Sequence, residues 1–483
     1  MTMEAKVFLE QITIENFKSI KRITLKLKPG VNLLVGPNKA GKTNILEAIY
    51  FLSKALSREE LLKIPYAPHV RFSWAPEELF FMKYTENPIV FGVDFRIVKR
   101  VGERHLKHVV KLEVRFAYSR SRLSVEPVYI AVDWGCTRLE ATGSEVRVYV
   151  STSCISSFLE LIHGVEEKDL MNLYTKLMEI GEKLGRIERG EYMLLDTVTL
   201  EHENAVQYIL LHNFSAYTSL HKVYDSGDMQ KELWVSSIAL PYARKPLWLP
   251  VLVEWVTTLS KEFTGFLTEA TDPLHLDLYT PLSIVSRALL LKHPDIEALT
   301  KPQPLYGEDE LDMRASNISR ILYKLSAERR TKAIEHLLNE VFRNIAIEPR
   351  STANMVFFTV REGSIELSPR NTANGIIKVL AIATAVELNP SILLIDEIEN
   401  SLHAEAIQKI FDFLNNLEIL VLVATHSPAV IDLVDLDRLI IVSRGSDGST
   451  NVEYIEDVKS VRKRLLELGV SHSEYILYSK TMR

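Results

Sequence analysis

The sequence has 483 residues, of which 47% are hydrophobic and 25% charged, and its formal net charge is −6. This composition is typical of a folded protein of two to three domains and excludes a disordered or collagen-like chain. Two cysteines are too few for a disulfide framework or a four-ligand zinc site, and they favour a reducing, cytoplasmic setting. No apolar run reaches the roughly 18 residues of a membrane span, and the first residues lack the apolar core of a signal peptide, so we expect no membrane partner.

The first sixty residues alternate between strand and helix patterns. Residues 8–16 and 23–27 carry the alternating apolar side chains of half-buried strands, and 31–35 is a continuous apolar run, as in a central strand. A loop containing glycines follows, and apolar residues at helical spacing predict a helix over 43–56. The order strand, loop, helix is the context that a phosphate-binding loop requires.

The loop between this strand and helix fits the pattern G-x-x-x-x-G-K-[ST]. Glycines let backbone N–H groups face phosphate oxygens, and the helix N-terminus adds a favourable dipole. We expect Lys42 to reach the β- and γ-phosphates of ATP and the Thr43 hydroxyl to ligate Mg²⁺. The alternative is a strand–helix turn that carries glycines by chance. The predicted ATP-binding residues in the loop are Gly36, Pro37, Asn38, Lys39, Ala40, Gly41, Lys42, Thr43 and Asn44.

The middle of the chain has a different pattern. Alternating β-forming residues at 90–98, 109–116, 128–132 and 146–150 predict an antiparallel meander. Residues 155–345 look largely helical, and prolines concentrated between Pro241 and Pro304 exclude a long coiled coil there. We therefore expect a compact helical subdomain, with a clear amphipathic helical region over 317–342.

Alternation of helices and strands resumes after a predicted hairpin over 355–367. The pattern predicts helices over 375–386 and 404–414 and strands over 392–395, 419–424 and 439–442. Parallel-sheet patterns therefore occupy both ends of the chain.

Polar residues follow two of these C-terminal strands. Asp396 and Glu397 end the strand at 392–395, and His426 follows the next strand. The carboxyl edge of a parallel sheet is where ligands bind. We expect Asp396 to hold Mg²⁺, directly or through water, and Glu397 to polarise the attacking water. His426 is expected to contact the γ-phosphate. The alternative is that all three are strand-end residues satisfied by solvent or by local hydrogen bonds.

Taken together, these motifs resemble ABC-type ATPases of the SMC/RecF/OLD-like group, especially stand-alone AAA-domain ATPases of bacteria and archaea. The resemblance covers about residues 8–55 and 314–445. It rests on N-F-K-S-I at 16–20, the loop at 36–44, R-A-S-N-I-S-R-I-L-Y-K-L at 314–325, I-D-E-I-E-N-S-L-H at 395–403 and A-T-H-S-P at 424–428. It implies an α/β P-loop NTPase fold: an ABC-type head whose mixed sheet is assembled from both chain ends, plus an antiparallel β lobe and a helical insertion.

The predicted domain organisation has four segments. Residues 1–60 form the N-terminal half of the ATPase head with the Walker A loop, and 61–150 form the antiparallel β lobe. Residues 151–345 form a mainly helical insertion. Residues 346–483 form the C-terminal half of the head, with the signature segment, Walker B, D-loop and switch histidine.

The resemblance also implies a homodimer that sandwiches two ATP molecules head to tail. Lys18 joins the ATP-binding residues, and His426 is the switch histidine. Residues 399–403 form the D-loop at the dimer interface, with Glu399, Asn400 and Ser401. The partner's signature segment at 371–375, with Ala373, Asn374 and Gly375, completes each site. The family pattern has serine where this chain has Ala373, and Asn374 or Thr372 is the alternative donor to the γ-phosphate. We therefore expect the protein to bind ATP with Mg²⁺ and to hydrolyse it slowly.

Two hypotheses concern the work that the ATPase performs, since fold alone does not define it. The first is ATP-gated action on DNA in repair or mobile-element defence. The mild negative charge argues against wholesale coating of nucleic acid, yet residues 96–122 carry nine basic residues against two acidic ones. A solvated sheet face is the alternative explanation. The candidate DNA-binding residues are Lys99, Arg100, Arg104, Lys107 and Lys111.

The second hypothesis is a regulatory ATPase that controls a separately encoded effector, such as a nuclease or toxin, through the helical insertion. OLD-like nucleases carry a metal-binding TOPRIM domain after the ATPase. The segment after His426 is too short for one, so we expect no nuclease domain in this chain.

Overall fold

The structure is a computed structural model. It describes residues 6–63, 74–101, 104–135, 137–151, 192–199, 205–206, 210, 215–225, 228–239, 270–277, 279–307 and 309–478. The chain divides into two compact units. The first comprises residues Met1–Thr13, Leu56–Glu77 and Tyr84–Ser283, and the second comprises Ile14–Ala55, Glu78–Lys83 and Ile284–Arg483. None of the helices in the described ranges is long and apolar enough to cross a membrane.

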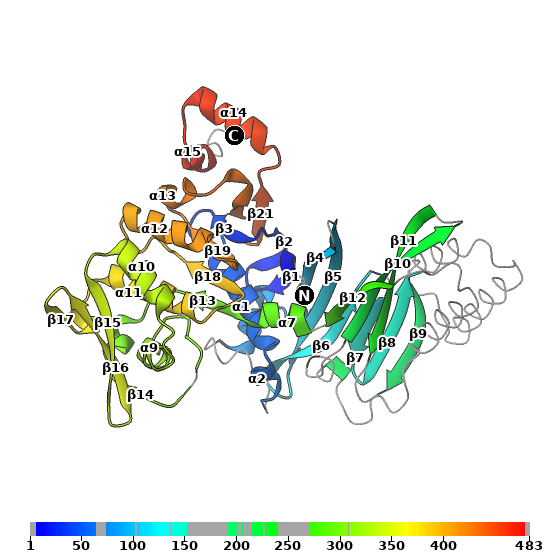
Figure 1. Ribbon diagram of the computed structural model, residues 1–483, viewed down its shortest axis with the longest axis horizontal. Helices are drawn as coiled ribbons and strands as arrows, with labels where there is room; N and C mark the ends of the chain where they lie inside the picture. The colour runs from blue at the N-terminus through cyan, green and yellow to red at the C-terminus, as the bar shows by residue number, and fades with distance from the viewer. Residues whose placement is uncertain are drawn as a thin grey trace, which may run out of the picture. The chain divides into compact units, whose positions relative to one another are not determined.

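The second unit is built on a six-stranded sheet with strand order β13-β18-β19-β3-β20-β21 (Figure 1). The first five strands are parallel and β21 is antiparallel to β20. The strands are β13 (Ala288–Leu291), β18 (Ile392–Asp396), β19 (Leu420–Thr425), β3 (Gly30–Val35), β20 (Leu439–Arg444) and β21 (Thr450–Tyr454). Since β3 lies between strands from the C-terminal part of the chain, the predicted mixed sheet made from both chain ends is confirmed.

Helices cover both faces of this sheet. Alternate residues of the strands, among them Leu291 and Ile395, belong to one hydrophobic core together with α10 (Lys332–Val341), α11 (Asn374–Glu387) and α12 (Ala404–Asn415). Helix α1 (Lys42–Ala55) contacts β13, β18 and β19, yet none of its buried side chains belongs to that core. Because successive side chains of a strand point to opposite faces, α1 packs on the other face.

A smaller antiparallel sheet and several helices complete the second unit. The predicted amphipathic region 317–342 forms two helices, α9 (Ile318–Ala327) and α10, with Arg329 in a left-handed conformation (φ 57°) between them. The small sheet contains β14 (Gln303–Pro304), β15 (Ile345–Thr352), β16 (Met355–Glu362) and β17 (Ile365–Leu367). The remaining helices are α8 (Ile296–Leu299), α13 (Pro428–Ile431), α14 (Val458–Leu468) and α15 (His472–Tyr478), and α7 (Tyr279–Ser286) spans the junction of the two units.

An eight-stranded sheet has the order β2-β1-β4-β5-β6-β7-β8-β9. Strands β4 to β9 pair antiparallel and belong to the first unit, whereas β1 begins in the first unit and its last residues, like β2, belong to the second. The sheet includes the four strands predicted for the β lobe and two that the pattern missed, β7 and β9. The bounds are β1 (Lys6–Phe17), β2 (Ile20–Lys26), β4 (Ile89–Val101), β5 (Arg104–Ser119), β6 (Ser124–Asp133), β7 (Thr137–Thr142), β8 (Glu145–Ser151) and β9 (Tyr192–Thr199). The short helix α2 (Arg58–Leu61) also lies in the first unit.

The structure differs from the expected mainly helical insertion over 151–345. Within the described part of that range lie β9 and a three-stranded sheet of β10 (Ser215–Asp225), β11 (Asp228–Ala239) and β12 (Ala270–Asp277). Strands β10 and β11 are rich in Tyr, Thr, Val and Trp, which favour strands, and short apolar runs do not separate helix from strand by periodicity alone. From residue 284 onward the chain belongs to the second unit, so β13, α9 and α10 are parts of the ATPase-like core. The rest of that range lies outside the described residues.

Candidate nucleotide-binding site

The loop between β3 and α1 is closed around its own lysine. The Lys42 ammonium donates hydrogen bonds to the carbonyl oxygens of Gly36 (2.7 Å) and Pro37 (3.0 Å). Burial lowers the pKa of Lys42, while the charges of Asp396, Glu399 and Glu397 act in the opposite direction. The ammonium therefore lies inside the loop, where phosphate oxygens of a bound nucleotide would compete with these carbonyls for it.

Packing requires glycine at both ends of the loop. A Cβ atom at Gly36 would lie 2.1 Å from the carbonyl oxygen of Val442 in β20. Gly41 has a left-handed backbone (φ 105°), and a Cβ atom there would lie 2.0 Å from the Thr450 hydroxyl oxygen. The glycines of the motif thus allow the neighbouring strands to approach the loop.

The acidic strand end meets the start of α1. The Thr43 hydroxyl donates a hydrogen bond of 2.9 Å to Oδ2 of Asp396, the last residue of β18. Burial raises the pKa of Asp396, and the hydrogen bond from Thr43 opposes that shift. Hydroxyl and carboxylate oxygens are hard donors that suit Mg²⁺, so this pair fits the ion that the motif implies.

Glu397 and the segment after it form a compact turn. Glu397 has a left-handed backbone (φ 49°), and its Oε2 accepts a hydrogen bond of 2.7 Å from the Asn400 side chain. Ser401 is also left-handed (φ 66°). Such conformations are costly for residues with side chains and persist where the surrounding contacts enforce them. The predicted D-loop residues therefore hold the predicted catalytic carboxylate in a defined orientation.

Glu399 binds the residues at the end of β19. Its Oε1 accepts hydrogen bonds from the Thr425 hydroxyl (2.9 Å) and from the backbone N–H of His426 (3.1 Å), and it lies 3.2 Å from His426 Nδ1. The His426 side chain is 45% exposed. With Nδ1 facing the carboxylate, the other ring nitrogen remains available to a ligand.

The predicted signature segment begins α11. Ala373 is the N-cap residue of this helix and makes no side-chain cap hydrogen bond. Asn374 and Gly375 form the first turn, and a Cβ atom at Gly375 would lie 2.7 Å from the Ser401 carbonyl oxygen. The signature segment and the D-loop of one chain are therefore in direct contact.

The N-F-K-S-I segment also contributes to the site. Lys18, in a left-handed conformation (φ 49°), lies at the turn between β1 and β2, and its ammonium is 2.6 Å from Oε2 of Glu47 on α1. Ser19 accepts a hydrogen bond of 2.6 Å from the Asn44 side chain and is 2.7 Å from the Thr450 hydroxyl. This segment thus connects the start of α1 to β21.

Sequence reasoning missed three charged residues around the site: Glu47, Lys292 and Lys378. Glu47 lies one helical turn after Thr43, a spacing that places both on one helix face. Lys378 is buried in α11, with its ammonium 3.3 Å from the Asp396 carbonyl oxygen. Lys292 follows β13, a four-residue strand too short to be recognised from its pattern.

The five candidate DNA-binding residues all lie on β4 and β5, but the strand register divides them. Arg100, Lys107 and Lys111 occupy positions of one face, across from His105, Val98 and Asp94 respectively. Lys99 and Arg104 share the alternate register with the buried residues Phe95 and Val110. Two further basic residues of this stretch, Arg96 and Arg115, are close to the carboxylates of Glu10 and Glu113.

Two family models match the chain on either side of its middle. The model described as "AAA ATPase domain" matches residues 8–186, which contain the phosphate loop. The model described as "AAA domain, putative AbiEii toxin, Type IV TA system" matches residues 286–432, which contain Asp396 and His426.

Curated relatives share a short segment with the chain. The "DNA replication and repair protein RecF" of Roseiflexus castenholzii is 47% identical over 51 residues, 11% of this chain and 13% of that protein. The protein of the same name from Moorella thermoacetica is 51% identical over 49 residues, 10% of this chain and 13% of that protein. The chain therefore matches only a small part of the length of these relatives.

The motifs and the two matching family models support an SMC/RecF-like ABC-type ATPase. Among solved structures, the chain is similar to an SMC head domain from Pyrococcus furiosus bound to a ScpA domain, with 12% identity and a TM-score of 0.39 over 96% of this chain and all of that one. It is also similar to the SMC head domain from Thermotoga maritima, with 11% identity and a TM-score of 0.35 over 93% of this chain and 99% of that one. Scores this low carry no conclusion about function.

Proposed function

We propose that this protein binds ATP with Mg²⁺ and hydrolyses it slowly, and that ATP joins two copies head to tail. The observation that carries the proposal is the hydrogen bond between Thr43 and Asp396, which brings two hard oxygen donors together beside the phosphate loop. Bound Mg²⁺ would neutralise charge on the β- and γ-phosphates. The loop N–H groups and Lys42 would bind the phosphates, and Lys42 would exchange the Gly36 and Pro37 carbonyls for phosphate oxygens.

The roles proposed for the remaining residues follow from their positions. Glu397 would orient the attacking water and accept its proton, with Asn400 fixing the carboxylate. His426 would contact the γ-phosphate while Glu399 holds the ring from its Nδ1 side. Slow turnover is proposed because Ala373 offers no hydroxyl to the γ-phosphate bound in the partner. Asn374 and Gly375 would complete the partner's site.

The proposal is tested by nucleotide binding. Lys42→Ala should weaken the affinity for Mg²⁺–ATP at least about tenfold, equivalent to about 1.4 kcal/mol, in titration calorimetry. Lys409→Ala is the matched control, because Lys409 lies on the surface of α12 in an ion pair with Glu405. Unchanged ATP affinity in Lys42→Ala would overturn the proposed function.

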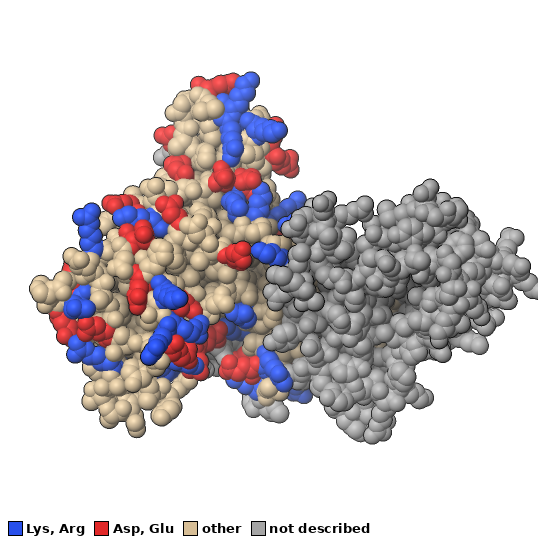
Figure 2. Space-filling model, in the orientation of Figure 1, with Lys and Arg blue, Asp and Glu red and all other residues tan. Residues whose placement is uncertain are grey.

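We further propose that the ATPase acts on DNA, in repair or in defence against mobile elements. The name of these relatives, DNA replication and repair protein RecF, supports this proposal. Figure 2 shows acidic and basic side chains interspersed over the visible face of the second unit, so that face offers no broad basic surface among its described residues. The basic positions of β4 and β5 in the first unit are the candidates for contact with DNA phosphates.

The DNA proposal predicts a strong dependence on salt, because phosphate contacts release counterions. Reversing the charge at Arg100, Lys107 and Lys111, which share one face, should weaken binding and reduce the salt slope. Lys301→Glu, on an exposed residue of the second unit, is the control. Absence of DNA binding at low salt, with and without ATP, would refute the proposal.

A second candidate function is control of a separately encoded effector. The family description that names a toxin of a type IV toxin–antitoxin system favours it, although that description belongs to the family model. The test is co-expression with the product of a neighbouring gene. If Lys42→Ala alters the toxicity or nuclease activity of that product while DNA binding is absent, the second candidate is favoured over the first.

A further inference from the structure

A cluster of three charged side chains lies beside the proposed magnesium pair. The Glu47 carboxylate is in ion pairs with the ammonium groups of Lys18 (2.6 Å) and Lys292. The Glu47 side chain is 6% exposed, and the Lys292 side chain 24%. One largely buried carboxylate therefore pairs with two ammonium groups in a partly desolvated site.

The sheet register places Lys292 level with Asp396. Strand β13 runs parallel to β18, with Leu290 paired to Leu394 and Leu291 paired to Ile395, so the next residues along the two strands are Lys292 and Asp396. Leu291 and Ile395 face the core formed with α11. Because strand side chains alternate, Lys292 and Asp396 lie on the opposite face, which α1 covers with Thr43 and Glu47.

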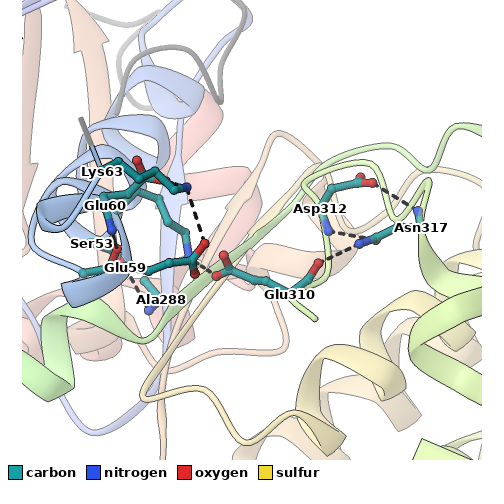
Figure 3. Close-up of polar contacts among 10 residues, drawn as sticks. Ser53, Glu59, Glu60, Lys63, Ala288, Glu310, Asp312 and Asn317 are labelled. Carbon is teal, nitrogen blue, oxygen red and sulfur yellow. Dashed lines mark hydrogen bonds and ion pairs between the residues drawn. The ribbon is translucent and has the colours of Figure 1, made fainter. Parts of the chain in front are cut away.

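Both ends of β13 are fixed to the surrounding structure. The N–H of Ala288 donates a hydrogen bond of 3.1 Å to the Ser53 hydroxyl of α1, and the N–H of Lys292 donates one of 2.7 Å to the Met313 carbonyl oxygen. The loop that contains Met313 is itself held by side chains: Asn317 Nδ2 donates to the Glu310 carbonyl oxygen (2.7 Å), and the Asp312 N–H donates to Asn317 Oδ1 (3.1 Å). Figure 3 shows Ser53 beside Ala288 and the Glu310–Asp312–Asn317 contacts.

The position of Lys292 points toward the outer end of the triphosphate. The phosphate loop follows β3 and would hold the inner phosphates of a bound nucleotide. Asp396 ends β18 and His426 follows β19, and both strands lie on the β13 side of β3. Lys292 directly follows β13, the strand that pairs with β18, and its positive charge opposes the rise that burial causes in the pKa of Asp396. An ammonium at this place can reach an oxygen of the outer phosphate that a diphosphate lacks.

We propose that Lys292 is a phosphate-contacting residue that makes the site selective for nucleoside triphosphate over diphosphate. Glu47 holds its ammonium beside the magnesium pair until the γ-phosphate competes for it. This inference rests on the proposed ATP binding and adds the residue that distinguishes ATP from ADP.

The test compares ATP and ADP affinities, both measured with Mg²⁺ by titration calorimetry on the full chain. Lys292→Gln should raise the Kd for ATP about tenfold and change the Kd for ADP less than about twofold. Lys292→Arg, which keeps the charge, should retain most of the preference for ATP. Lys301→Gln, an exposed lysine of the same segment, is the control and should match the wild type for both nucleotides.

Equal changes in both affinities, or none, would overturn the inference, even if the melting temperature falls, because that pattern indicates a structural ion pair. If Lys292→Gln does not fold, the double variant Glu47→Gln/Lys292→Gln removes both charges and tests the same point: a retained preference for ATP would refute the role of Lys292. Failure of the proposed function is detected separately. If the phosphate loop does not bind ATP, Lys42→Ala and the wild type will have the same affinity for ATP.

Discussion

The Thr43 hydroxyl donates a hydrogen bond of 2.9 Å to the Asp396 carboxylate, joining two residues that are 353 positions apart in the chain. The contact depends on β3 lying between strands that the chain supplies some four hundred residues later. Formation of this site therefore requires both chain ends to be folded together, so ligand affinity reports on assembly of the whole sheet.

Replacing Asp396 with asparagine should separate stability from magnesium binding. Burial raises the pKa of Asp396, which means that its charged form is disfavoured in the folded protein. Asp396→Asn keeps the acceptor for Thr43 and removes that cost, so the melting temperature should equal or exceed that of the wild type. The affinity for Mg²⁺–ATP should fall at least about tenfold, whereas binding of ATP in EDTA should be unchanged. A variant with normal Mg²⁺ dependence would contradict the proposed metal site.

Glu397→Gln should trap the proposed ATP-bound dimer. The substitution keeps the shape of the side chain and an oxygen that accepts the Asn400 hydrogen bond, but it removes the base that would take a proton from water. Light scattering after gel filtration should give twice the monomer mass in Mg²⁺–ATP and the monomer mass in ADP. Adding Lys42→Ala to the same variant should abolish the shift. A single mass under all conditions would argue against the ATP sandwich.

Ala373→Ser tests the signature segment through two independent effects. A serine N-cap accepts a hydrogen bond from the first turn of α11, which lacks a side-chain cap, and should stabilise the protein by about 1 kcal/mol. If the segment also contacts the γ-phosphate in the partner, ATP turnover should rise several-fold. Ala373→Asn is the control, since asparagine caps helices equally well without a hydroxyl. Equal turnover in both variants would show that only the helix cap matters.

Glu399 is predicted to act through His426. Glu399→Ala removes the acceptor for Thr425 and for the His426 backbone, at a cost of about 1–3 kcal/mol of stability. The turnover number should fall about tenfold with little change in ATP affinity. The double variant with His426→Ala should be no slower than His426→Ala alone, because residues that act as a unit are not additive. Additive losses would instead assign Glu399 an independent role.

The parts of the fold that carry motifs could be predicted from sequence. Each motif residue there lies at the end of a strand or the start of a helix, and local sequence patterns identify both. Asp396 ends an apolar strand, and Lys42 opens a helix after a glycine loop, so their neighbourhood follows from strand order. Lys292 and Glu47 could not be placed in the same way. Their contact depends on the pairing of the four-residue strand β13 with β18. This pairing joins residues far apart in the chain, so the periodicity of the local sequence does not predict it.

Two strands in the middle of the chain, β10 and β11, were not predicted from the sequence pattern. Strands β10 and β11 pair antiparallel, and their apolar residues alternate only in part, because Trp234 and Val235 are adjacent. The largely helical pattern expected over 155–345 therefore does not hold for these strands, where pairing between strands decides the structure. The candidate DNA-binding residues all lie on β4 and β5, but the strand register, which the sequence does not provide, assigns them to two faces.

Lys378 should make stability depend on pH. Burial lowers its pKa from 10.5 to about 8, although the charges of Asp396, Glu399 and Glu397 oppose the shift. Below about pH 8 the amine is protonated in both folded and unfolded states, so the folded protein carries the full cost of a buried charge. Between about pH 8 and 10.5 the unfolded state binds more protons, so this contribution to the free energy of unfolding rises with pH.

Urea unfolding of the wild type and of Lys378→Met, which retains the volume without the charge, checks this sign. A difference of about 2.5 pKa units corresponds to about 3 kcal/mol, so the advantage of Lys378→Met at pH 7 should shrink by roughly that amount at pH 10. Other titrating groups are common to both proteins and cancel in the comparison. Lys409→Met, at a partly exposed residue whose ammonium pairs with Glu405, should show no such change. A constant difference between pH 7 and pH 10 would mean that the Lys378 ammonium keeps its proton, held by the carbonyl oxygens of Asp396 and Glu397.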